Sequence, residues 1–170
     1  MKTTIAALLL LSPIPLALYS TTASAKSYDC PFLQGLAPFQ EDIAYQAYRA
    51  GNPYNIGLTT VAIAWEESKL GLYKVRFGKG KDVSVGTMHS AVYWKTKGMS
   101  AFERGIWVES MITNNAKAIQ VGVDDLLMWR DVTDGDYRGM INGYNTGYGS
   151  NSKYVQRVVG YVRELKKCKF

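Results

Sequence analysis

Histidine and cysteine are scarce in this 170-residue chain: His89 is the only histidine, and Cys30 and Cys168 are the only cysteines. A zinc site with four cysteines, with two cysteines and two histidines, or with three histidines lacks its ligands. Any Ser-His-Asp or Cys-His mechanism would depend on His89 alone. The chain also lacks a phosphate-binding P-loop and a G-x-G-x-x-G sequence. We therefore expect no metal and no cofactor, and we look for chemistry among the carboxylates, amides and tyrosines.

A long hydrophobic run is missing near the start of the chain. The apolar stretch 5–11 is far shorter than the about 20 residues that a membrane span needs. It follows the basic Lys2 and precedes Ala23-Ser24-Ala25, which fits the small-x-small cleavage pattern of a secretory signal peptide. We predict a signal peptide over 1–25 and an exported domain over 26–170 that has no membrane span. The alternative is an uncleaved amphiphilic anchor.

Export changes the interpretation of the two cysteines, which lie close to the two ends of the predicted domain. In an oxidising periplasmic or extracellular compartment, Cys30 and Cys168 are expected to form a disulfide. Two free, buried thiols are the alternative.

Acidic residues are outnumbered in the chain, which carries 14 Asp and Glu against 20 Lys and Arg, a net charge of +6. Without Lys2 the exported domain has 19 basic and 14 acidic residues, a net charge of +5. This charge favours an anionic envelope polymer or surface, although it also simply aids solubility. A nucleic-acid binder or nuclease would need a dense basic stripe or a cluster of metal-binding carboxylates, which the sequence lacks. We therefore expect no nucleic-acid partner.

The apolar spacing predicts a single, mainly helical domain around a buried central helix. The glycine- and lysine-rich stretch 71–81 predicts a loop or short hairpin, and a second glycine-rich segment covers 139–150. Helices are expected over 38–50, with Gly51 as the stop, over 56–70, and from 152 onward. A further helical stretch is expected from the capping box at Ser100 to about residue 130. We expect this stretch to break near Gly122, with Asp124 as the cap of its second part.

The sharpest chemical feature is Trp65-Glu66-Glu67-Ser68, which ends a helix that carries no charge between residues 55 and 65. Apolar residues on both sides of this helix indicate that it lies in the core. Burial raises the pKa of a carboxyl group and keeps it protonated, as a general acid requires. The helical wheel does not choose between Glu66 and Glu67. The alternative is that the last turn of the helix simply reaches solvent, which would explain the two carboxylates without a catalytic role.

Two later segments, Asp82-Val-Ser-Val-Gly-Thr-Met-His89 and Tyr144-Asn-Thr-Gly-Tyr148, combine glycine with small polar and aromatic residues. Glycine lets the backbone approach a sugar, while amides, hydroxyls and tyrosine rings contact the sugar directly. Taken in order with Glu67-Ser68 and a terminal helix led by Tyr154, these segments resemble the lytic transglycosylase family, which has a lysozyme-like fold. The resemblance covers roughly residues 56–161.

The resemblance implies cleavage of the β-1,4 bond between N-acetylmuramic acid and N-acetylglucosamine in peptidoglycan, with Glu67 rather than Glu66 as the catalytic acid. Glu67 would protonate the leaving oxygen and then act as base on the muramyl 6-hydroxyl, so that a 1,6-anhydro product forms without water. We expect a monomer acting on peptidoglycan glycan strands. The resemblance places the following residues at the substrate: Ser68, Ser84, Gly86, Met88, His89, Tyr144, Asn145, Gly147, Tyr148 and Tyr154.

Two positions depart from the family pattern, and several alternatives stay open. His89 replaces the usual glutamine, which makes the hydrogen bond there pH-dependent, and Thr146 replaces an alanine. A lysozyme-type hydrolase would need a second carboxylate, for which Asp82 and Glu66 are candidates. A non-catalytic envelope-binding module is a third hypothesis. A phage lysis enzyme and a wall-opening enzyme of a secretion or conjugation machine fit the sequence equally.

Overall fold

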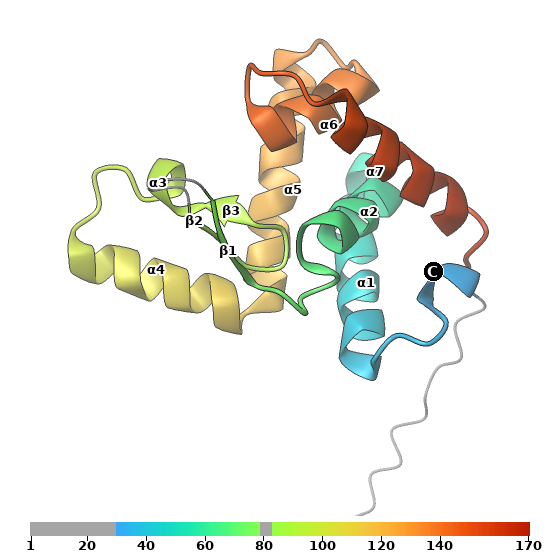
Figure 1. Cartoon of the computed structure of the whole chain (residues 1–170), viewed down its shortest axis with the longest axis horizontal. Helices are drawn as coiled ribbons and strands as arrows, with labels where there is room; N and C mark the ends of the chain where they lie inside the picture. The colour runs from blue at the N-terminus through green and yellow to red at the C-terminus, as the bar shows by residue number, and fades with distance from the viewer. Residues whose placement is uncertain (1–29, 79–82) are drawn as a thin grey trace, which may run out of the picture.

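The computed structural model describes residues 30–78 and 83–170, so the expected signal peptide and Asp82 lie outside the described residues. Within these ranges, seven α-helices accompany one small three-stranded antiparallel sheet, as the sequence predicts (Figure 1). The helices are α1 (Pro38–Gly51), α2 (Gly57–Ser68), α3 (Val92–Lys95), α4 (Ala101–Thr113), α5 (Asn115–Val132), α6 (Tyr137–Thr146) and α7 (Ser152–Leu165). Two 3-10 turns, Pro31–Leu33 and Asn52–Tyr54, precede α1 and α2.

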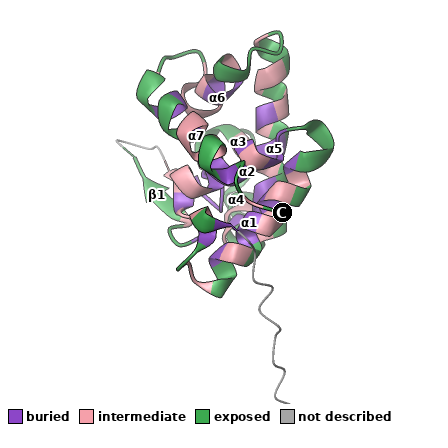
Figure 2. Ribbon diagram, turned by 90° about the vertical axis from the view of Figure 1, so that its right-hand side faces the viewer, coloured by how far each residue is buried: buried purple, intermediate pink, exposed green. Residues whose placement is uncertain are grey.

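Helix α2 is the buried central helix that its uncharged stretch before Glu66 predicts. It packs against α1, α5 and α7, and Val61 to Ala64 have no exposed surface. Burial of a side chain such as Ile63 stabilises the fold by about 1.5–3 kcal/mol. The buried residues lie on the inward faces of the surrounding helices (Figure 2). A core of this kind gives the last turn of α2, with its two glutamates, a rigid support.

The sheet lies on the side of α5 away from α1, α2 and α7, together with α3 and α4 (Figure 1). Strands β1 (Val75–Phe77), β2 (Val83–Val85) and β3 (Ser90–Ala91) pair in that order. The β1–β2 pair is the hairpin expected after Gly71. A second small core of Val85, Met111 and Ala118 fixes β2 to α4 and α5.

The long helical stretch after Ser100 breaks at a different residue from the one expected. Ser100 caps α4 through the predicted capping box, but α4 ends at Thr113 rather than near Gly122. The Asn114 side chain accepts a hydrogen bond from the Lys117 amide and so begins α5. Gly122 lies inside α5, where a Cβ atom would come within 2.4 Å of the Met88 sulfur. The glycine therefore allows close packing and does not end a helix.

Gly51 is the last residue of α1, as the sequence predicts, and the chain then continues through a 3-10 turn to Asn55, which has a positive φ of 61°. The glycine-rich segment after residue 139 is largely helical, because Asp136 caps α6 by accepting hydrogen bonds from the Arg138 and Gly139 amides.

The two ends of the described chain are joined by a disulfide between Cys30 and Cys168, which confirms the expected pairing. Helix α7 precedes Cys168 and buries Val155, Val158 and Leu165 against the core. Among the described residues, no helix is long and apolar enough to cross a membrane.

Candidate active site

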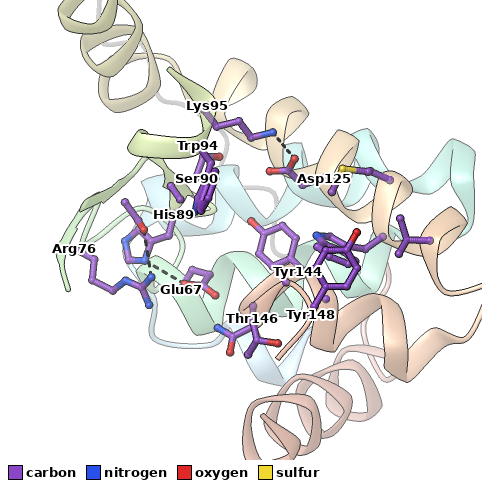
Figure 3. A pocket seen from close by; sticks show the side chains of 18 residues that line it. Glu67, Arg76, His89, Ser90, Trp94, Lys95, Asp125, Tyr144, Thr146 and Tyr148 are labelled. Atoms are coloured by element: carbon purple, nitrogen blue, oxygen red, sulfur yellow. Dashed lines mark hydrogen bonds and ion pairs between the residues drawn. The ribbon is translucent and has the colours of Figure 1, made fainter. Parts of the chain in front are cut away.

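A cleft of about 800 Å³ lies where the end of α2, the sheet, α3, α5 and the end of α6 meet (Figure 3). Glu67 and His89 line one part of it, and the segment after Gly143 lines another. Seven of the residues expected at the substrate or in catalysis share this cleft: Glu67, Ser84, His89, Tyr144, Asn145, Gly147 and Tyr148.

The Glu67 carboxyl group is held from two sides at the wall of this cleft. Its side chain is only 7% exposed. The Tyr154 hydroxyl of α7 donates a hydrogen bond of 2.7 Å to Glu67 Oε1, and His89 Nδ1 lies 3.2 Å from Oε2. The core behind α2 and these two contacts fix the orientation of the carboxyl group, as a positioned acid requires.

Glu66 lies outside the residues that line this cleft and contacts α7. Arg157 Nε donates a hydrogen bond of 2.7 Å to Glu66 Oε1, and Arg157 Nη2 lies 2.6 Å from the same oxygen. The two adjacent glutamates therefore occupy different environments, a distinction that the helical wheel could not make.

Ser68 is completely buried and does not line the cleft. Its hydroxyl donates to the Thr87 carbonyl oxygen at 2.6 Å and accepts from the Gly71 amide at 2.7 Å. Lys69, Leu70 and Gly71 all have positive φ, a strained conformation for the two residues with side chains. Ser68 thus stabilises the sharp turn that ends α2 directly behind Glu67.

Gly86 and Met88 also lie behind the cleft wall and not on its surface. Gly86 has a φ of 86°, and a Cβ atom there would approach Ala118 Cβ to 2.9 Å, so both the backbone angle and the available space require glycine. Met88 is buried in the main core, and its carbonyl oxygen accepts a hydrogen bond from the Tyr144 hydroxyl. These residues hold the segment that presents His89.

Two tyrosines flank Glu67. Burial raises the pKa of the Tyr144 and Tyr154 hydroxyls well above their usual value, and the negative charge of Glu67 raises both further. Both groups therefore stay neutral and can act as hydrogen-bond donors. Tyr154 is buried and does not line the cleft, but it reaches the site through its bond to Glu67.

The last turn of α6 and the segment that follows it form an edge of the cleft. Asn145 Oδ1 accepts a hydrogen bond of 2.9 Å from Asn151, the residue that caps α7. Tyr148 is 92% exposed, and its ring contacts Trp129 edge-to-face with the ring centroids 5.3 Å apart. Exposed aromatic rings beside a polar cleft are suited to stacking on the faces of sugars.

The sequence did not predict most of the residues that the sheet, α3 and α5 contribute to the cleft. Lys95 of α3 and Asp125 of α5 form an ion pair across it (Figure 3). Burial raises the pKa of the Asp125 carboxyl, and Lys95 partly opposes this shift. No spacing signal marks these residues, because they belong to separate helices that only tertiary packing brings together. The missed residues with a polar or aromatic side chain are Arg76, Ser90, Trp94, Lys95, Asp125, Trp129 and Thr146.

Ser90 lines the cleft, but its hydroxyl is buried and has no hydrogen-bond partner among the described residues. Burying an unpaired polar group costs about 1–3 kcal/mol.

We expect Ser90→Ala to leave the free energy of unfolding unchanged or to raise it. Ser68→Ala should instead lower the free energy of unfolding by about 1–3 kcal/mol, because it leaves the Thr87 carbonyl oxygen and the Gly71 amide unpaired. Urea denaturation of both variants checks this. Equal destabilisation by the two substitutions would contradict it.

The described residues contain no group of three or more His, Cys, Asp or Glu side chains arranged to hold a metal ion. Comparisons of the chain with models of known protein families, with curated proteins and with solved structures found no match.

Proposed function

We propose that this protein is a peptidoglycan-cleaving lytic transglycosylase that acts on the bond between N-acetylmuramic acid and N-acetylglucosamine, with Glu67 as general acid and base. The observation that carries the proposal is the position of Glu67. Its carboxyl group is almost completely buried, is held by Tyr154 and His89, and lies at the wall of a cleft large enough for sugar rings. The ordered motifs of the sequence supply the substrate class.

In the first step, the Glu67 carboxylic acid donates its proton to the glycosidic oxygen, and the bond from that oxygen to C1 of the muramyl residue breaks. The Glu67 carboxylate then accepts the proton of the muramyl 6-hydroxyl while O6 bonds to C1. Glu67 is thereby protonated again, and no water is consumed. A single carboxyl group that changes its protonation state is sufficient for both steps.

The remainder of the cleft supplies groups suited to a glycan. Trp94, Trp129 and Tyr148 offer aromatic surface for sugar faces. Asn145 and the backbone around Gly147 line the cleft beside them.

Hydrolysis of the lysozyme type is a second candidate function, because Asp125 is a further carboxylate in the same cleft. Such a mechanism needs a second carboxylate about 5–9.5 Å from the first. Glu66, one of the two sequence candidates, instead bonds Arg157 outside the cleft lining, and Asp82 lies outside the described residues. Asp125 is engaged by Lys95, which favours the one-carboxylate mechanism.

Mass spectrometry of muropeptides distinguishes the two reactions. Purified peptidoglycan digested by this protein is expected to yield muramyl ends that are lighter than hydrolysed ends by one water molecule. Reducing ends of full mass would show a hydrolase. The absence of any cleavage by the folded wild-type protein would instead favour a non-catalytic envelope-binding module.

The disulfide supports export of the domain, because disulfides form and persist in oxidising compartments such as the periplasm. Peptidoglycan is reached from that compartment. Phage-induced lysis and local opening of the wall for a secretion or conjugation machine both require this location and this chemistry.

A further inference from the structure

Arg76 brings a positive charge to the cleft from the exposed strand β1. Its Nη2 donates a hydrogen bond of 3.2 Å to the Ser84 hydroxyl of the neighbouring strand β2, and this bond orients the guanidinium group. A guanidinium has five N–H donors in a planar fork, and the bond to Ser84 uses one of them. The ion pairs among the described residues do not include Arg76.

The carboxyl groups of the described cleft lining are engaged by other residues. Lys95 pairs with Asp125, and Glu67 is held by Tyr154 and His89. The guanidinium on β1 therefore faces the cleft with donors to spare and without a carboxylate partner among the described residues. A cation in this position favours a ligand that carries an anionic group.

Arg76 and Glu67 lie at the same end of the cleft (Figure 3). Both act on the hydroxyl group of Tyr144. Burial and the charge of Glu67 raise the pKa of this hydroxyl, and the charge of Arg76 partly opposes the rise. An anionic group bound by Arg76 would therefore lie close to the part of the ligand that meets Glu67.

We propose that Arg76 binds a carboxylate on the C3 substituent of the reacting muramyl residue, so that the cleft prefers acidic muramyl strands to neutral glycans. The inference rests on the proposed function, which brings C1 of that residue to Glu67. The same sugar ring carries a lactyl ether at C3. On a peptide-free strand the lactyl group ends in a carboxylate, and on an intact strand it is joined to a stem peptide with carboxylates of its own. The arginine fork matches either carboxylate through two parallel hydrogen bonds.

Binding to matched strands tests this pairing without cleavage. Glu67→Gln protein is titrated with peptide-free strands and with intact strands, each with free carboxylates and with the carboxylates blocked as neutral methylamides. Blocking should weaken binding by about three- to tenfold, because a charge-assisted pair is strong but this guanidinium is exposed to water. When Arg76→Gln is added to this protein, free and blocked strands should bind alike. The strand preparation that shows the difference identifies the carboxylate as lactyl or as part of the stem peptide.

Two further variants control for charge and shape. Arg104→Gln removes the same charge from an exposed position on α4 outside the cleft lining, and it should keep the difference between free and blocked strands. Arg76→Lys should keep part of the difference, because an ammonium group attracts a carboxylate but cannot form two parallel hydrogen bonds with it. A difference that persists unchanged in Arg76→Gln, or no difference in the protein with Arg76 intact, would overturn the proposal.

Cleavage kinetics separate this inference from the proposed function. With peptidoglycan as substrate, Arg76→Gln should raise KM by about three- to tenfold and change kcat little, as does the loss of binding energy that is equal in the ground and transition states. If the wild-type protein does not cleave peptidoglycan, the proposed function fails, while the binding difference still decides whether Arg76 pairs with a carboxylate. If cleavage occurs but the binding difference does not depend on Arg76, the proposed function stands and the role of Arg76 falls.

Discussion

Glu67→Gln is expected to reduce the rate of peptidoglycan cleavage by about 10²–10⁴-fold, the usual contribution of a positioned general acid. Glutamine has nearly the same shape and can still accept the hydrogen bond from Tyr154, but its amide cannot donate the proton that the leaving oxygen needs. The fold should be preserved, because the side chain lies at the wall of a cleft and is not packed within the core. Release of soluble muropeptides measures the rate, and circular dichroism measures the fold.

Glu66→Gln is the matched control, since it makes the same chemical change at the adjacent residue. Its carboxyl group lies outside the cleft lining and pairs with Arg157, and a glutamine amide oxygen can still accept from that guanidinium. This variant should therefore retain most of the cleavage activity. If Glu66→Gln abolished cleavage and Glu67→Gln did not, the catalytic assignment would be reversed.

Loss of the disulfide is expected to have the largest effect on stability. Cys30 and Cys168 are 138 residues apart, and closing a loop of this length stabilises a fold by about 4–5 kcal/mol in the chain-entropy model. The double variant Cys30→Ser/Cys168→Ser should therefore lower the free energy of unfolding by about that amount. Domains of this size have only about 5–15 kcal/mol in total, so much of the stability would be lost.

Equilibrium denaturation in urea measures this change, with the wild-type protein in oxidised and reduced form as the control for the two serine substitutions. The reduced wild type and the double variant should unfold at similar urea concentrations. A loss below about 1 kcal/mol in both would show that the unfolded chain gains little freedom when the bond is absent.

The sequence predicts well those features that depend on neighbouring residues. The capping box at Ser100 begins α4 because its partner Glu103 is three residues away. The stretch of α2 before Glu66 is buried because it has no charged side chain on either side of the helix to face water. The disulfide follows from the expected export and from the absence of any other cysteine.

The sequence was less reliable where packing competes with local preference. Gly122 resembles a helix break, yet it lies within α5 because Met88 occupies the space that a side chain would fill. Ser68, Gly86 and Met88 belong to segments that resemble substrate-binding motifs, but their side chains or backbone support the cleft wall from behind. A motif shows which residues occur together and does not show which of them reach the surface.

By itself, the sequence determined the helical class of the domain, the buried helix that ends in two glutamates and the absence of enough histidine and cysteine for zinc chemistry. Only the tertiary structure decided that Glu67 faces the cleft, that Glu66 pairs with Arg157, and that His89 contacts both Tyr73 and Glu67. The physical reason is distance along the chain. Helix periodicity and capping involve residues three or four apart, whereas the partners of Glu66 and Glu67 lie 22 to 91 residues away and meet only when the core forms.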